Sequence, residues 1–208
     1  MNFALKLRYR ALPVACILAA FALSLAAKDF VKPAARSAKT YPAHDDHTDD
    51  KVAIAADPYD TPDKAKIFSV KFEDHGFLPI FFIVTNDGDQ PISIANMDVK
   101  LITANRSKLT PASSEDIYRR LNNPQAATRP SPLPIPRKNV KGAITQKERD
   151  EVESSQFAAR AVEPHTTQSG FLFFDIGDIS IAGAHLDLTG VNDSKGSELM
   201  YFEIPLKK

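Results

Sequence analysis

Cysteine and tryptophan are the scarcest residues of this 208-residue chain, which has one cysteine, Cys16, and no tryptophan. Cys16 lies early in an apolar run that continues to residue 27. Lipid is added to a cysteine at the cleavage site, where such a run should end, so the pattern does not favour a lipoprotein. The chain after this run has no cysteine, which excludes a disulfide partner and a thiol nucleophile.

An excess of charge of one sign is also absent, since 26 basic residues balance 26 acidic ones. Without residues 1–27, 23 basic and 26 acidic residues remain, a net charge of −3. A slightly acidic chain lacks the electrostatic footprint of nucleic-acid binding, so no nucleic-acid partner is predicted.

Glycine is scarce as well, with eight residues. The chain contains no phosphate-cradling glycine loop, no GxSxG nucleophile elbow and no HExxH zinc motif. No cofactor is therefore predicted, and a binding protein is favoured over an enzyme. A hydrolase whose triad comes from distant positions, with His165 or His185 beside a serine or threonine, would leave no local motif and is the third hypothesis.

The N-terminus has the three-part layout of a secretory signal. Lys6, Arg8 and Arg10 precede an apolar run over residues 11–27, and Ser24-Leu25-Ala26 fits the small-x-small rule for cleavage. The predicted location is periplasmic or extracellular. The 17-residue run is at the short edge of what spans a bilayer, so an uncleaved N-terminal anchor is the alternative.

A polar linker is predicted over residues 28–50 and a β domain over 51–208. Residues 78–84 are apolar throughout, which suits a strand buried on both faces, and Asp87-Gly88 after it predicts a hairpin. Short apolar runs between turn residues predict strands at 52–56, 67–72, 78–84, 92–95, 97–103, 169–176, 184–191 and 198–206. Seven or eight strands with few helices between them favour a mainly antiparallel β-sandwich.

Residues 111–160 are interpreted as a helical, proline-rich insertion between strands, at one end of the sandwich. A helix is predicted at 113–121, with Ile117 and Leu121 docking it on the sheet. A second helix is predicted at 145–159, where Thr145 and Glu148 form a capping box.

HDDHTDD, at residues 44–50, carries six residues that can bind a metal. On a helix, His44 and His47 would share one side and could bind zinc or copper. However, the stretch has no apolar residue to hold it in place, and a solvated tether cannot orient ligands. A charged spacer is the favoured interpretation.

The remaining histidines offer a second metal hypothesis. His75, His165 and His185 could lie near one end of a sandwich and bind zinc or copper. Single histidines are more often surface or turn residues. A periplasmic metal-binding protein is therefore the alternative function.

Between the two predicted helices, five of the fifteen prolines lie at residues 124–136. Alternating prolines with flanking basic residues are typical of an extended segment that docks on a partner. The usual alternative is a stiff surface loop. The predicted partner-binding residues are Arg129, Pro132, Leu133, Pro134 and Arg137, with Arg119 and Arg120 nearby in sequence.

Two segments, EPHTTQSGFLFFDI at 163–176 and LPIFFIVTNDGDQPISI at 78–94, resemble a pattern in exported bacterial proteins with an immunoglobulin-like β-sandwich. The resemblance covers residues 66–103 and 163–206, and its motifs are structural. It implies an immunoglobulin-like fold in the periplasm or at the cell surface. The leading hypothesis is a non-enzymatic envelope protein, either a structural module or one that binds another protein or an envelope component.

Overall fold

The computed structural model describes residues 30–122, 144–199 and 201–206. The predicted signal segment lies outside these ranges, as do residues 123–143 of the proline-rich segment. The strands are β1 (His44–His47), β2 (Val52–Pro58), β3 (Phe77–Asn86), β4 (Ile92–Ser93), β5 (Asp98–Ile102), β6 (Lys108–Leu109), β7 (Ala161–Val162), β8 (Thr166–Asp175), β9 (His185–Thr189) and β10 (Phe202–Pro205). The α-helices are α2 (Pro62–Ala65), α3 (Ser114–Asn122) and α4 (Gln146–Ser155), and two 3₁₀ turns are η1 (Ala38–Thr40) and η2 (Glu73–His75).

Two four-stranded antiparallel sheets make up most of the protein. The first sheet has the order β1-β2-β3-β8 and the second has the order β10-β9-β5-β6. β4 and β7 form a small two-stranded ribbon. The mainly β, antiparallel class predicted from the sequence is confirmed.

The two sheets face each other across an aliphatic core, here called the inner cluster. Alternation along each strand fills it, because successive side chains of a strand point to opposite faces. β3 contributes Leu78, Ile80, Phe82 and Val84 from the first sheet. The second sheet contributes Val99, Leu101, Leu186, Leu188, Phe202 and Ile204, each less than 9% exposed.

The opposite face of the first sheet is buried as well, under what is here called the outer cluster. β3 and β8 place Phe81, Phe171 and Phe173 on this face. The helices α3 and α4 and the segments around residues 30 and 68 cover them. All ten residues of β3 are therefore buried, which confirms the prediction of a strand covered on both faces.

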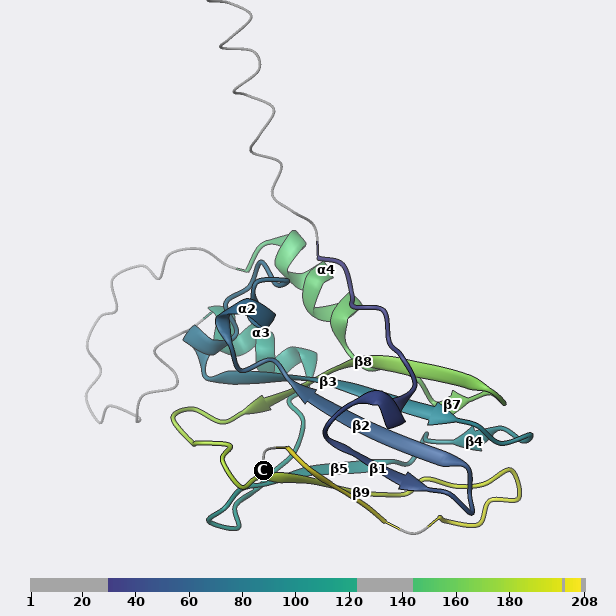
Figure 1. The fold of residues 1–208 in the computed structure, drawn as a ribbon. Coiled ribbons are helices and arrows are strands. Elements are labelled where there is room, and N and C mark those ends of the chain that lie inside the picture. The colour runs from purple at the N-terminus through teal and green to yellow at the C-terminus, as the bar shows by residue number, and fades with distance from the viewer. Residues whose placement is uncertain (1–29, 123–143, 200, 207–208) are drawn as a thin grey trace, which may run out of the picture.

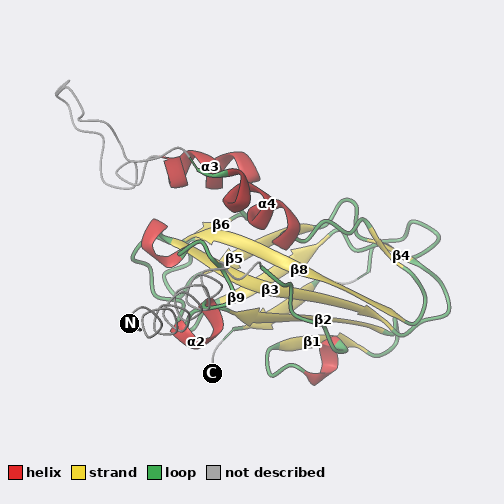
Figure 2. Ribbon diagram, turned by 90° about the horizontal axis from the view of Figure 1, so that it is seen from above, coloured by secondary structure: helices red, strands yellow, loops and turns green. Residues whose placement is uncertain are grey.

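Figures 1 and 2 show the resulting layers: helices α3 and α4, then β8, β3 and β2, and then the second sheet. The sequence places these helices correctly, since α3 matches the prediction at 113–121 and α4 carries the predicted Thr145–Glu148 capping box. Their predicted site at one end of the sandwich is wrong, because they pack on the outer face of the first sheet. α4 also ends at Ser155, earlier than predicted.

The end of α4 is followed by a close approach of two backbones. Phe157 donates its N–H to the carbonyl oxygen of Phe171 in β8 (3.0 Å), and Gln156 bridges to the same strand. A Cβ on Gly170 would lie 2.5 Å from Cα of Phe157, closer than two such carbons can come. Glycine is required at this position because the chain crosses β8 there.

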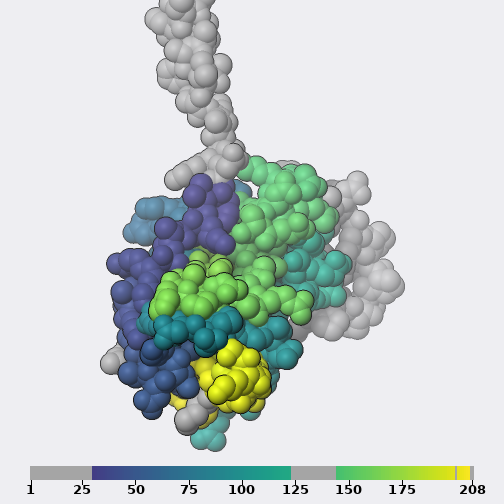
Figure 3. Space-filling view, turned by 90° about the vertical axis from the view of Figure 1, so that its right-hand side faces the viewer, coloured from purple at the N-terminus to yellow at the C-terminus, as the bar shows by residue number. Residues whose placement is uncertain are grey.

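The predicted polar linker at residues 28–50 is corrected in its central part. Residues 44–47 form β1, an edge strand that pairs with β2 in the register His44↔Ala55 to His47↔Val52. Backbone hydrogen bonds hold an edge strand without apolar side chains, and charged residues protect its free side from further pairing. Earlier in the chain, the segment that begins at Phe30 lies against α4, as the purple and green surfaces in Figure 3 show.

The predicted strand at 67–72 is absent from the described fold. Phe68, Val70 and Phe72 do point together into the outer cluster, as alternation implies. Their segment lies over the face of the first sheet, away from its edges, so its backbone finds other partners. The N–H groups of Ser69 and Val70 donate to the buried carboxylate of Glu151 in α4 (2.9 and 3.1 Å).

The predicted hairpin at Asp87-Gly88 is also corrected. The chain turns there, with the Gly88 N–H donating to Oδ1 of Asn86 (2.9 Å). However, β3 pairs with β2 and β8, and β4 pairs with β7. Gly88 is not among the glycines with positive φ, so the turn does not use the freedom on which the prediction rested.

Candidate functional site

A pocket of about 330 Å3 lies beside α3, at the edge of the outer face of the first sheet. It brings together the two described members of the predicted partner-binding set, Arg119 and Arg120, with two aspartates. Its lining residues are Phe77, Thr110, Pro111, Ala112, Asp116, Arg119, Arg120 and Asp175.

The N-terminus of α3 is fixed before the arginines are reached. Ser113 and Asp116 cap each other: the Asp116 N–H donates to Oγ of Ser113 (3.2 Å), and the Ser113 hydroxyl donates to the Asp116 carboxylate (2.7 Å). The Ala112 N–H donates to the Phe173 carbonyl oxygen (2.7 Å), which ties the approach to β8. Ile117 is fully buried, so the helix has one fixed orientation.

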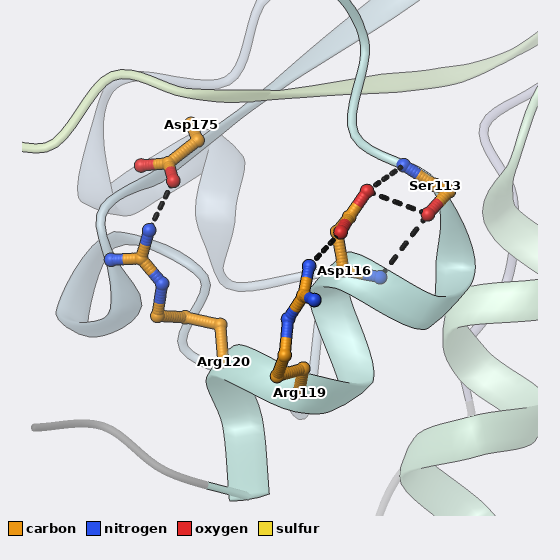
Figure 4. Close-up of polar contacts among 5 residues, drawn as sticks. All are labelled: Ser113, Asp116, Arg119, Arg120 and Asp175. Atoms are coloured by element: carbon orange, nitrogen blue, oxygen red, sulfur yellow. Dashed lines mark hydrogen bonds and ion pairs between the residues drawn. The ribbon is translucent and has the colours of Figure 1, made fainter. Parts of the chain in front are cut away.

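Arg120 points toward the sheet. Its guanidinium forms an ion pair with Asp175, the last residue of β8 (Figure 4). It also lies 5.7 Å from the ring centroid of Phe77. The side chain is 18% exposed. A planar guanidinium held on a ring and by a carboxylate is preorganised, so Arg120 forms a fixed wall of the pocket.

Arg119 points toward solvent. It pairs with Asp116 one helical turn earlier, and its side chain is 69% exposed (Figure 4). Hydrogen bonds from Ser113, followed by smaller contributions that include the charge of Arg119, lower the pKa of Asp116. Asp116 thus stays ionised at neutral pH and balances the charge of the arginine.

The rest of the predicted partner-binding set lies outside the described residues. These residues are Arg129, Pro132, Leu133, Pro134 and Arg137. In sequence they lie between α3 and α4.

His44 and His47 do not share a face. Residues three apart in a strand point to opposite sides. His44 bonds the carbonyl oxygen of Tyr41 through Nδ1 (2.6 Å), whereas the His47 ring stacks on Phe202 (3.8 Å between centroids). His47 also lies 3.6 Å from Asp45. The shared metal site that a helix would have formed is therefore not built.

His75, His165 and His185 have separate surroundings. His165 contacts Asp89 (3.1 Å) and His185 contacts Asp187 (3.3 Å), while His75 lies in η2. Over residues 30–122, 144–199 and 201–206, no group of three or more His, Cys, Asp or Glu side chains is placed to hold a metal ion. The predicted assembly of these three histidines is not found there.

Sequence reasoning missed the partners of the two arginines. Asp175 is 55 residues from Arg120, and no local pattern links them. Helical periodicity does contain a signal for the arginines themselves. At about 100° per residue, Arg119 lies about 200° from the buried Ile117 and faces outward, whereas Arg120 lies nearer the docking face.

Comparison of this chain with protein-family models, with curated proteins and with solved structures finds no match. In the part of the chain that the structure describes, no helix has the length and apolar character needed to cross a bilayer. The interpretation of the pocket therefore depends on its own geometry.

Proposed function

We propose that this chain is a non-enzymatic, exported cell-envelope protein that binds another protein through the pocket beside α3 and the proline-rich segment after it. The domain that carries this site is proposed to be an immunoglobulin-like β-sandwich. Two antiparallel sheets around the inner cluster support that fold, and the signal-like N-terminus supports export.

One observation carries the proposal: a rigidly docked helix presents an exposed arginine at the mouth of a pocket. The buried side chains of Ile117 and Tyr118 fix α3, so little order has to be gained when a partner binds. Arginine is enriched among residues that dominate binding energy, because it combines a charge with a flat apolar surface.

The polar groups at this site are engaged in structural roles, which favours binding over catalysis. The Ser113 hydroxyl caps α3 through Asp116, and Asp175 holds Arg120.

The test is crosslinking in the native host cell. A photoreactive amino acid replaces Thr110, an exposed residue of the pocket lining, in the full chain, and a matched variant carries it at Lys195, in the exposed turn between β9 and β10. Mass spectrometry identifies what is attached and also gives the N-terminus of the protein. We expect one or two envelope proteins attached at position 110, absent from the Lys195 variant.

Equal attachment at both positions, or none at position 110 in a folded protein, would remove the support for a binding site at α3. A protein that lies inside the cytoplasm, together with its N-terminus, would separately refute the proposed export.

A further inference from the structure

The pocket beside α3 combines a small apolar patch with a mouth where two arginines pair with two aspartates, Asp116 and Asp175. Phe77 is 3% exposed, and Pro111 and Ala112 are half-buried next to it. Arg119 lies at the mouth, on the solvent side of α3. A volume of about 330 Å3 is at the lower end of the range for small-ligand sites, which suits one or two amino-acid side chains.

The two arginines differ in how firmly they are held. Arg120 is 18% exposed, lies over Phe77 and pairs with Asp175. Each guanidinium has five N–H donors in a planar fork, and the contact with Asp175 uses one of the terminal nitrogens of Arg120. Arg120 therefore stays in place as the wall against which a bound group rests.

The pair between Arg119 and Asp116 can be exchanged. Their side chains are 69% and 48% exposed, and an exposed pair of this kind on a helix surface contributes little to stability. Asp116 keeps the hydrogen bond from Ser113 when the arginine turns away. The guanidinium of Arg119 is then free to take a carboxylate in two-point geometry.

We propose that this pocket binds a peptide carboxylate that adjoins an apolar side chain. The carboxylate pairs with Arg119 in place of Asp116, and the apolar side chain lies on Pro111 and Ala112, beside the guanidinium of Arg120 that covers Phe77. The proposal rests on the proposed protein-binding function and names the chemistry that the partner presents. The carboxylate is that of a chain terminus or of an acidic side chain, and the test separates the two.

The experiment measures peptide binding by calorimetry, with the full chain in the form that cells produce. Three acetylated peptides are used: Gly-Ala-Gly-Leu with a free C-terminus, the same peptide as its amide, and the amide Gly-Glu-Leu-Gly. We expect at least one carboxylate peptide to bind about tenfold more tightly than the Gly-Ala-Gly-Leu amide, the ratio typical of one added charge-assisted hydrogen bond. Tight binding of the free acid assigns a chain terminus, and tight binding of the glutamate peptide assigns a side chain.

Two variants make the result specific to the pocket. Arg119→Gln should remove the tenfold preference, whereas Arg160→Gln, which changes an exposed arginine outside the pocket lining, should retain it. Since Arg119 is mostly exposed, the unfolding midpoint of Arg119→Gln should equal that of the original chain.

Equal binding of acid and amide, or a preference that survives Arg119→Gln, would overturn the carboxylate site. Crosslinks at position 110 without any carboxylate preference would overturn this inference alone and leave the protein-binding function supported. Loss of the crosslinks as well would overturn both.

Discussion

The two faces of the first sheet are built by different means. On the inner face, β3 meets strands of the second sheet, and aliphatic side chains predominate on both sides. On the outer face, the same strand meets two helices and irregular segments, and aromatic rings are far more frequent than on the inner face. Phe171 alone has ring neighbours at Tyr59, Phe68 and Phe81, with centroids 4.9, 4.9 and 5.1 Å away.

This difference follows from what each covering segment can supply. Strands of a second sheet bring a regular row of side chains and satisfy their own backbone by pairing. An irregular segment has no such pairing, so it needs large side chains to bury enough area and special partners for its N–H groups. The outer layer, which also carries the candidate site, therefore depends on a few residues.

The largest effect is expected from Phe171→Ala in the outer cluster. The ring is 1% exposed. Its removal leaves a cavity between the rings of Phe30, Tyr59, Phe68, Phe81 and Phe173, which cannot all move in to fill it. We expect a loss of about 4 kcal/mol in the free energy of unfolding. Urea titration followed by far-UV circular dichroism measures it, since the chain has no tryptophan.

Leu186→Ala is the matched change in the inner cluster, where the side chain is fully buried. We expect about 3 kcal/mol for it. A loss below about 1 kcal/mol for Phe171→Ala would show that the outer layer is not part of the cooperative fold, and the comparison between the two faces would fail.

A smaller effect is expected from Glu151→Gln. The carboxylate is 3% exposed and accepts hydrogen bonds from the N–H groups of Ser69 and Val70 and from the Ser69 hydroxyl. An amide presents one acceptor oxygen and turns its NH₂ group toward these donors. We expect a loss of about 2 kcal/mol, typical of hydrogen bonds to a charged group.

Asp150→Asn is the control on the same helix, and we expect a change of less than about 0.5 kcal/mol because the side chain is exposed. Hydrogen exchange provides a second measurement. Faster exchange of Ser69 and Val70 in Glu151→Gln, with unchanged β3, would locate the loss in the outer layer. Uniformly faster exchange would contradict a local role.

The last effect appears only at alkaline pH. Burial, ahead of other causes, raises the pKa of Tyr59 and of Tyr118 to about 12, and both rings pack in the outer cluster. An unfolded tyrosine has a pKa of about 10, so the folded state holds its phenolic protons more tightly. The resulting stabilisation is complete below about pH 10 and is lost as the pH rises from about 10 to about 12.

Urea midpoints measured from pH 8 to 12 test this prediction. Tyr59→Phe and Tyr118→Phe should each flatten the decline, whereas Tyr201→Phe, at a side chain that is 57% exposed, should leave it unchanged. The inner cluster contains no titratable side chain, so a decline that persists in the double variant Tyr59→Phe/Tyr118→Phe would place the alkaline weakness elsewhere.

Local patterns were sufficient for several elements. The apolar run at 78–84 predicted β3 and its two buried faces, and the Thr145–Glu148 capping box predicted the start of α4. Both signals depend on neighbours within a few residues, which is why they could be recognised without the fold.

The candidate site was predictable only in part. The cap of α3 and the position of Ile117 are local, and they place Arg119 on the solvent side. The pocket is not local, because Phe77 and Asp175 come from β3 and β8. The comparison between the predicted metal function and the predicted binding function also depends on this assembly, because the fold determines whether the histidines share a site.

The sequence by itself determined the mainly antiparallel β class, the hydrophobic rows of the long strands and the two helices of the insertion, since each depends on periodicity and caps within one segment. The tertiary structure decided which backbone partner each polar or alternating segment finds. Residues 44–47 became β1 because the edge of β2 was free to pair with them, and residues 67–72 lost their strand because they lie over a sheet face, where Glu151 satisfies their backbone. Such outcomes depend on which sheet edge or face the rest of the fold leaves uncovered, and the sequence of a single segment does not contain that information.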